Sequence, residues 1–136
     1  MKRLLQIRYT DNAVTVSMLL LRVGLGLMMI PHGYQKLINF ADRASKFADP
    51  FHIGSSTSMA LTIFAEFFCS VFIILGLFTR LAAIPPIIAM SVALFYSNRG
   101  DIFGTGEKAG LFLIGFLVIL LLGPGKISAD KLITGK

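Results

Sequence analysis

The sequence predicts an all-α integral membrane bundle of four transmembrane helices, formed by a single domain over residues 1–136. Hydrophobic residues make up 55% of the chain and charged residues only 15%, and the mean hydropathy is +0.78. A soluble domain of this length has too much surface for its volume to bury that apolar content, so lipid is the expected solvent. Four long apolar runs, at about 13–31, 57–78, 81–97 and 108–123, supply the spans.

The first span follows a short basic head, and it is too long to be the apolar core of a signal peptide. Pro31 removes a backbone hydrogen bond and is expected to kink or loosen the last turn. On a helical wheel, two glycines and a second charge fall within about 40° of Arg22. These residues are Gly26, Gly33 and Lys36. Because glycine lets a neighbouring helix approach closely, we expect the other helices to pack against this face.

The remaining elements follow from polarity and from helix breakers. Residues 38–56 are too polar to cross a membrane and repeat apolar residues at roughly helical spacing, so a short amphipathic segment is expected between the first two spans. The third span carries Pro85 and Pro86 near its start, where proline is tolerated best. The fourth span has no charge after its first residue and is stopped by Gly123-Pro124-Gly125.

The distribution of basic residues predicts the orientation, because four spans place both termini on one side of the membrane. The Lys and Arg residues on that side are Lys2, Arg3, Arg8, Arg80, Lys126, Lys131 and Lys136. These seven residues outnumber the five on the opposite side, so the positive-inside rule predicts cytoplasmic termini. The formal net charge is +6, but the basic residues lie between apolar runs and form no nucleic-acid-binding motif. We therefore expect the lipid bilayer, and no nucleic acid, as a partner.

The cysteine and histidine content limits the cofactors that the chain can hold. The one cysteine, Cys69, excludes an intrachain disulfide, a CxxC redox motif and a thiolate metal cluster. The two histidines, His32 and His52, lie 20 residues apart without carboxylates at ligand spacing, so no metal site is predicted. We also expect no covalently bound cofactor.

Arg22 and Glu66 are the candidate buried polar centre. Each lies about nine residues from the start of its span, roughly 13 Å deep in a hydrocarbon core about 30 Å thick. An ion pair between them would reduce the cost of placing either charge in lipid. Two interpretations stay open: the pair only holds two helices together, or it lines a polar pocket for a proton, a quinone headgroup or a small anion.

His32 and Lys36 lie one helical turn apart near the outer interface. In one interpretation the Lys36 ammonium reaches the lipid headgroups and His32 is a helix-end residue. In the other, the two side chains bind an anionic or quinonoid group at the mouth of a pocket, and His32 transfers protons.

Six segments of the chain occur in an order and spacing that resemble a known family. These segments are Arg22-x-x-x-Gly26, Gly33-Tyr-Gln-Lys36-Leu37, Glu66, Leu75-Gly-Leu-Phe-Thr79-Arg80-Leu-Ala-Ala83, Glu107 and Gly123-Pro-Gly125-Lys-Ile-Ser128-Ala-Asp130. Together they resemble the DoxX family of small bacterial membrane proteins over about residues 19–130.

The resemblance implies a four-helix bundle in the bacterial inner (cytoplasmic) membrane, in a family whose members are described as subunits linked to quinone-dependent oxidoreductases. It carries over Arg22, Gly33, Lys36, Glu66 and Glu107 as candidate site residues. We expect an integral membrane subunit associated with a quinone-linked oxidoreductase system, at most a non-autonomous part of the enzyme. Quinone is the candidate cofactor, and partner subunits or a homo-oligomer are the candidate protein partners.

Two other functions stay open, and each predicts different geometry. A quinone site predicts an apolar cleft beside Lys36. A non-enzymatic membrane scaffold or anchor predicts direct contact between Arg22 and Glu66 without a cavity. A small-molecule carrier predicts a water-accessible path that reaches Glu66 from both sides of the membrane.

Overall fold

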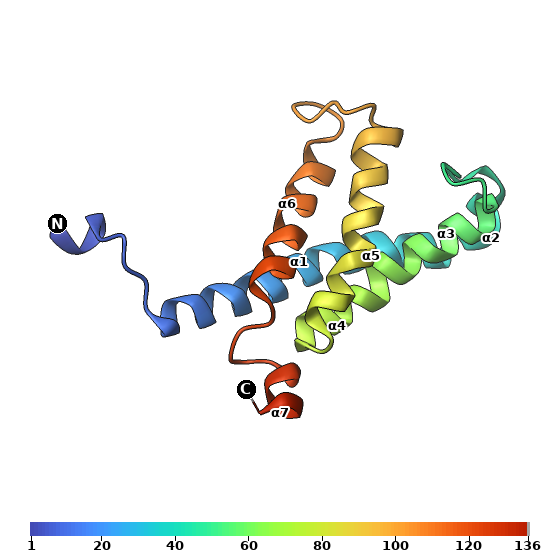
Figure 1. Cartoon of the computed structure of the whole chain (residues 1–136). Helices are drawn as coiled ribbons and strands as arrows, with labels where there is room; N and C mark the ends of the chain where they lie inside the picture. The colour runs from blue at the N-terminus through green and yellow to red at the C-terminus, as the bar shows by residue number, and fades with distance from the viewer. Residues whose placement is uncertain (136) are drawn as a thin grey trace.

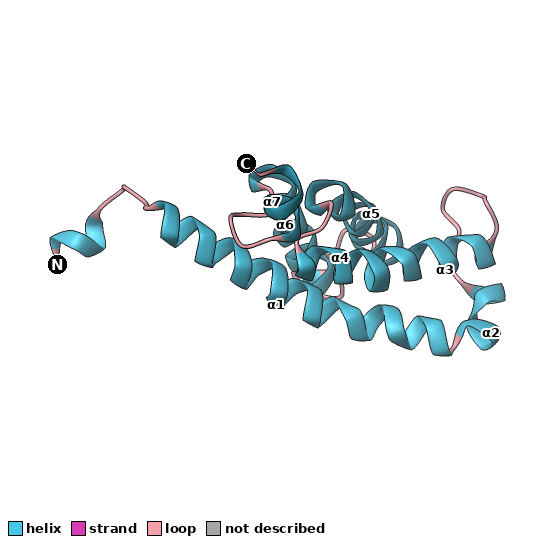
Figure 2. Ribbon diagram, turned by 90° about the horizontal axis from the view of Figure 1, so that it is seen from below, coloured by secondary structure: helices cyan, strands magenta, loops and turns pink. Residues whose placement is uncertain are grey.

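The computed structural model describes residues 1–135, and every regular element in this part of the chain is a helix. Helix α1 (Asp11–Ile38) is the longest, and the other helices pack along it (Figures 1 and 2). Its N-terminus is capped by Thr10, whose Oγ1 accepts a hydrogen bond of 3.1 Å from the Ala13 N–H. Lys136, which the charge count includes, lies outside the described residues.

Pro31 does not end the first helix, because α1 continues past it to Ile38. The helix is therefore longer at its C-terminal end than the predicted span of about 13–31. Proline is tolerated inside membrane helices because neighbouring groups satisfy the carbonyl that it leaves without a donor. Gly33 and Lys36 therefore belong to the helix, as the helical wheel requires.

The second span is one continuous helix in three parts. These are α3 (Ser55–Ile63), the π-helical turn η3 (Phe64–Phe68) and α4 (Cys69–Leu75). The helix lies beside α1 and runs antiparallel to it (Figure 2). It ends at Gly76, whose φ of +68° is the left-handed conformation that terminates many helices and that glycine adopts without strain.

The second half of the chain forms a pair of helices that crosses the first helix, α1. Helix α5 (Thr79–Ser91) continues into a second π-helical turn, η4 (Val92–Ser97). Helix α6 (Glu107–Leu122) lies beside α5, and both cross α1 in Figure 1. The chain then returns to the junction between α4 and α5 and forms the short helix α7 (Ala129–Thr134).

Three helical stretches are long and apolar enough to cross a membrane: Asp11–Ile38, Ser55–Leu75 and Thr79–Ser97. They correspond to the first three predicted spans. The fourth predicted span forms α6, whose 16 residues are fewer than the roughly 17–25 that a membrane-spanning helix usually has. The described structure therefore supports three candidate spans rather than four.

The predicted amphipathic segment between the first two spans is shorter than a single helix over 38–56. It consists of α2 (Phe40–Arg43) and one 3-10 turn, η2 (Ala44–Lys46). Ala44 is buried against Met59 of α3, which holds the segment on the second span. The chain then loops back to the start of α3.

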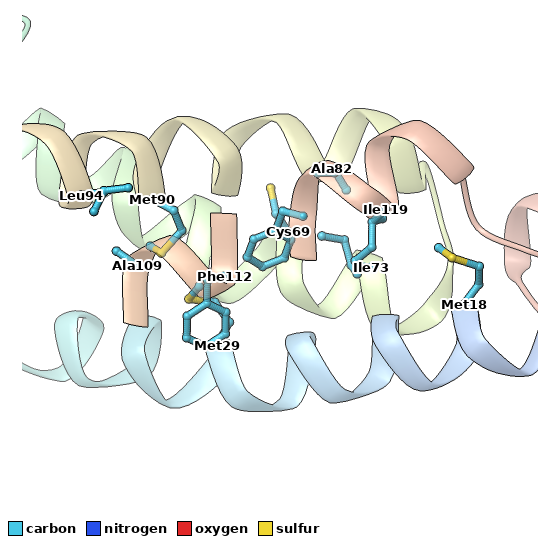
Figure 3. Close-up of a cluster of buried hydrophobic side chains, with 12 residues drawn as sticks. Met18, Met29, Cys69, Ile73, Ala82, Met90, Leu94, Ala109, Phe112 and Ile119 are labelled. Carbon is cyan, nitrogen blue, oxygen red and sulfur yellow. The ribbon is translucent and has the colours of Figure 1, made fainter. Parts of the chain in front are cut away.

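The hydrophobic core lies where α1, α4, α5 and α6 meet (Figure 3). Met29, Ile73, Phe116 and Ile119 are almost fully buried there. On the opposite face of α6, Leu121 is 76% exposed, and many other large apolar side chains point outward in the same way. Extended apolar surface of this kind marks contact with lipid.

Helix α1 approaches the second span closely at Gly26 and Gly33. A Cβ on Gly33 would lie 2.7 Å from the Phe67 nitrogen and 2.9 Å from the Glu66 carbonyl carbon. A Cβ on Gly26 would collide with the Ile74 side chain. The obstacle at Gly33 is backbone, which cannot turn aside as a flexible side chain can.

Gly33→Ala is expected to destabilise the protein by about 1–3 kcal/mol, because the added methyl group forces α1 away from η3. Gly24→Ala is the matched control, since a Cβ there meets nothing within 4 Å and alanine favours a helix interior by about 0.5–1 kcal/mol. Thermal unfolding in detergent micelles measures both changes. Equal effects of the two substitutions would contradict the close approach.

Candidate functional site

Lys36 and Glu66 form an ion pair between α1 and the π-helical turn η3. The Lys36 Nζ lies 2.6 Å from the Glu66 Oε2, and the two side chains are 25% and 5% exposed. The close approach at Gly33 brings the backbone of η3 against α1 one turn before Lys36. The helix packing therefore brings the two charges together, and each offsets part of the cost of burying the other.

The ion pair borders a pocket of about 420 Å³, called the Lys36 pocket below. The walls come from the α2–α3 loop, α3, η3, α5 and η4. Most of the lining side chains are apolar, among them Phe51, Leu61, Phe64 and Ile88. An apolar pocket with a few polar groups is typical of small-molecule sites, whose volumes are about 300–1,000 Å³.

Both π-helical turns contribute to the walls of the Lys36 pocket. Glu66 comes from η3, and Ala93 comes from η4 on the neighbouring span. A π-helical turn places one extra residue in a helix and is found frequently at functional sites. Two such turns around one pocket make it the candidate site of the described chain.

Lys36 and Glu66 both keep hydrogen-bonding capacity beyond their mutual contact. The ammonium group of a lysine has three N–H donors, and one of them serves Glu66. Glu66 accepts through Oε2 and keeps Oε1 for another donor. The hydroxyls of Ser58 and Thr62, in contrast, already donate to Asp49 and to the Ser58 carbonyl. The pair thus offers donors and a carboxylate acceptor side by side.

Asp49 fixes the loop that forms one wall of the Lys36 pocket. Its carboxylate accepts hydrogen bonds from the Ile53 N–H (3.0 Å), the Gly54 N–H (2.8 Å) and the Ser58 hydroxyl (2.8 Å). Desolvation opposes the charge, but these hydrogen bonds outweigh it and hold the pKa of Asp49 below its ordinary value. The sequence prediction did not single out Asp49. A carboxylate a few residues before the start of a helix is the signal that points to it.

The predicted ion pair between Arg22 and Glu66 is wrong, because Glu66 pairs with Lys36 instead. Arg22 is 1% exposed, and its guanidinium donates to four backbone carbonyls. The acceptors are the carbonyls of Ile73 (3.1 Å), Ile74 (3.2 Å), Ile127 (2.8 Å) and Pro124.

These contacts give Arg22 a structural role away from the pocket. Two of the carbonyls belong to the last turn of α4, where backbone acceptors lack helical donors and a positive charge is favourable. The other two belong to the segment that follows α6. Arg22 therefore joins α1, the end of α4 and the C-terminal segment.

Asp130 also belongs to this junction. Its Oδ1 accepts from the Phe78 N–H at 2.7 Å and its Oδ2 from the Thr79 N–H at 2.9 Å, at the start of α5. Desolvation by itself would raise the pKa of Asp130, but the hydrogen bonds from Thr79 and Phe78 and the charge of Arg22 hold it below its ordinary value. The carboxylate acts as an N-terminal cap for α5, supplied from another part of the chain.

Asp130→Ala is expected to destabilise the protein by about 1–2 kcal/mol at pH 7, the usual cost of losing a helix cap. Because the folded state lowers the pKa of Asp130, the stabilisation is complete well above pH 3.8 and decreases as the pH falls below that value. Unfolding in micelles at pH 7 and pH 3 should therefore show a smaller difference between variant and parent at pH 3. Asp42→Ala, at an exposed carboxylate, is the control. A loss that is the same at both pH values would contradict the ionised cap.

His32 and Glu107 do not line the Lys36 pocket in the described chain. His32 is half-buried and packs edge-on against Phe112 of α6, with 5.9 Å between the ring centroids. Glu107 is exposed in the first turn of α6. Of the predicted polar site residues, the structure thus brings two together at the pocket and places Arg22, His32 and Glu107 elsewhere.

Three apolar helices that are long enough to cross a bilayer, with an ion pair beside an apolar pocket, define an all-helical integral membrane protein with a buried polar site. The family model described as DoxX matches residues 17–99. This segment is more than half of the 136 residues and contains both members of the ion pair, and the chain belongs to the DoxX family. The resemblance seen in the sequence is thereby confirmed. No curated protein and no solved structure matches the chain.

Proposed function

We propose that this DoxX-family protein is a membrane subunit that binds a quinone headgroup in the Lys36 pocket and serves a quinone-linked oxidoreductase system. The observation that carries the proposal is the Lys36–Glu66 ion pair on the wall of a largely apolar pocket. A quinone headgroup is an apolar ring with polar oxygen atoms, so it matches both parts of this site.

The ion pair supplies hydrogen bonds to both redox forms of a quinone. A quinone carbonyl accepts a hydrogen bond, which the free N–H groups of Lys36 can donate. A quinol hydroxyl donates one, which Glu66 Oε1 can accept. The single cysteine provides no thiol pair and no iron–sulfur ligand set. Electrons therefore come from a partner subunit, in keeping with a non-autonomous role.

The membrane topology is part of the proposal. Helix α6 is a fourth, short span: its 16 residues extend over roughly 24 Å, which local thinning of the bilayer can accommodate. The termini then lie on the cytoplasmic side of a bacterial inner membrane, as the positive-inside rule predicts. The Lys36 pocket lies near the C-terminal end of α1, and therefore toward the outer side.

The alternatives rest on weaker observations than the quinone site. The scaffold interpretation requires a direct contact between Arg22 and Glu66 without a cavity, and Glu66 instead borders a pocket. A carrier requires access to Glu66 from both sides, whereas the Lys36 pocket, with the α2–α3 loop as one wall, is a single space beside Glu66. Association with partner subunits or with copies of the chain remains part of the proposed function.

Binding of quinone analogues to the protein in lipid nanodiscs tests the proposal. We expect saturable binding of ubiquinone or menaquinone analogues that is lost in Lys36→Ala and in Glu66→Gln. Lys108→Ala, at an exposed lysine, should bind like the parent. Circular dichroism and thermal unfolding show whether each variant keeps its fold. Absence of saturable binding to a folded parent protein would refute the proposal.

A further inference from the structure

A second apolar hollow lies beside the Lys36 pocket, between the second span and α5. It measures about 290 Å³ and is called the Cys69 groove below. Phe64 and Pro85 line both the groove and the Lys36 pocket, so the two spaces are neighbours separated by shared side chains. The remaining lining residues of the groove are Cys69, Phe72, Phe78, Leu81, Ala82 and Ile84.

The Cys69 groove has the chemistry of a site for an apolar chain. Every residue that lines it is apolar or, in the case of Cys69, a weakly polar thiol, and none carries a charge. The small side chains of Cys69 and Ala82 come from α4 and α5, which pack together, and both also belong to the hydrophobic core drawn in Figure 3. Without strong hydrogen-bonding side chains, the groove favours a hydrocarbon over a headgroup.

The two spaces are arranged in sequence along one helix axis. Ala93 lines the Lys36 pocket and Leu81 lines the Cys69 groove, twelve positions apart on α5 and η4. At about 1.5 Å per residue, the two spaces together extend over roughly 18 Å of this helix. Lys36 and Glu66 border only the Lys36 pocket, so a ligand that fills both spaces has its polar group in that pocket and an apolar part in the groove.

We propose that the Cys69 groove binds the tail of the same molecule whose headgroup occupies the Lys36 pocket. The ligand is then a quinone with a long polyprenyl tail. This inference rests on the proposed function. It adds to that function a tail-binding site and a preference for long-tailed over tailless quinones.

A series of quinones with one headgroup and different tails tests the inference in lipid nanodiscs. The series comprises a tailless quinone, a decyl quinone and a long polyprenyl quinone. Binding is expressed per mole fraction in the bilayer, because a longer tail by itself concentrates the ligand in lipid. We expect the polyprenyl quinone to bind about tenfold more tightly than the tailless one on this scale, a difference of about 1.4 kcal/mol from packing against the groove.

Variants at the groove distinguish the contribution of the tail to binding from that of the headgroup. Ala82→Leu fills the groove and should remove the preference for long tails while tailless binding persists. Ala60→Leu, at an exposed alanine outside both spaces, is the matched control. Because Ala82 is only 6% exposed and its variant could misfold, Leu81→Ala provides a second probe. Leu81 is 68% exposed, so its loss should weaken polyprenyl binding several-fold and leave the fold intact.

The outcomes distinguish the two proposals. Saturable binding that depends on Lys36 but not on tail length overturns the tail site and leaves the quinone site in place. Absence of binding by every quinone in the series overturns both. A photoreactive group in the polyprenyl tail should label the segments 69–72 and 78–85. If a photoreactive phospholipid labels these segments and saturating polyprenyl quinone does not reduce the labelling, the groove holds ordinary lipid and the inference is wrong.

Discussion

Replacement of Arg22 by methionine is expected to lower the free energy of unfolding by about 3 kcal/mol or more. Methionine has a similar unbranched length but no donor, so four carbonyls lose a charged partner. A hydrogen bond to a charged group contributes about 1.5–3 kcal/mol. The variant recovers part of the sum because it no longer buries a charge. Reversible unfolding in micelles measures the difference.

Two further variants show whether the geometry of Arg22 or merely its charge is responsible. Arg22→Lys keeps the charge but has no planar fork, so it should recover only part of the loss. Arg80→Met removes an exposed arginine with one hydrogen bond of 3.4 Å and should change the stability by no more than about 0.5 kcal/mol. Similar losses in Arg22→Met and Arg80→Met would contradict the assigned role. Folded Arg22→Met protein should still bind quinone, because Arg22 lies outside the Lys36 pocket.

The sequence predicted the helices well because a segment inside lipid must satisfy its own backbone hydrogen bonds, which leaves helix as the available structure for long apolar runs. It did not predict how far α1 extends beyond Pro31, since that depends on neighbouring groups around the proline. It also did not predict the π-helical turns η3 and η4. Such turns change the hydrogen-bond register within a helix without a marked change in composition.

The wrong partner for Arg22 has a geometric origin. The prediction measured depth from the start of each span and so placed Arg22 opposite Glu66. In the structure Gly33 lies opposite Glu66, and Arg22 lies opposite the end of α4 near Gly76. Gly33 comes eleven positions after Arg22, so the true register differs from the assumed one by about eleven residues, or roughly 16 Å.

The partners of Arg22 are backbone carbonyls, and the types of residue in the sequence do not reveal which carbonyls bind it. Carbonyl groups occur at every residue, and only the end of a helix or a turn makes them available. The pairing of Lys36 with Glu66 was, in contrast, open to prediction. Lys36 shares a helical face with Gly33. A glycine lets the neighbouring backbone approach at Gly33, so the next turn of α1, which carries Lys36, lies against the same segment as Gly33, the one that contains Glu66.

Simultaneous replacement of Lys36 and Glu66 by methionine is expected to restore stability that either single replacement removes. Lys36→Met leaves a carboxylate that is 5% exposed without its partner, and Glu66→Met leaves the ammonium in an apolar pocket. Breaking a buried pair costs about 3–5 kcal/mol, and the partial exposure of Lys36 reduces this to about 2–4 kcal/mol. The double variant has no unpaired charge and should lie within about 1 kcal/mol of the parent. Unfolding measurements on all four proteins form a double-mutant cycle.

Measurements of quinone binding in the same four proteins show whether the Lys36–Glu66 pair only joins two helices or also binds a ligand. The surface pair Lys126–Asp11, with its charged atoms 3.3 Å apart and its side chains 60% and 84% exposed, is the matched control and should show a coupling energy below about 1 kcal/mol. If the ion pair only joins helices, its removal in the stable double variant changes no other property of the protein. If the pair recognises a headgroup, the double variant is stable and does not bind, because methionine offers neither donor nor carboxylate. A stable double variant that binds quinone as tightly as the parent would show that the headgroup is recognised by other residues of the pocket.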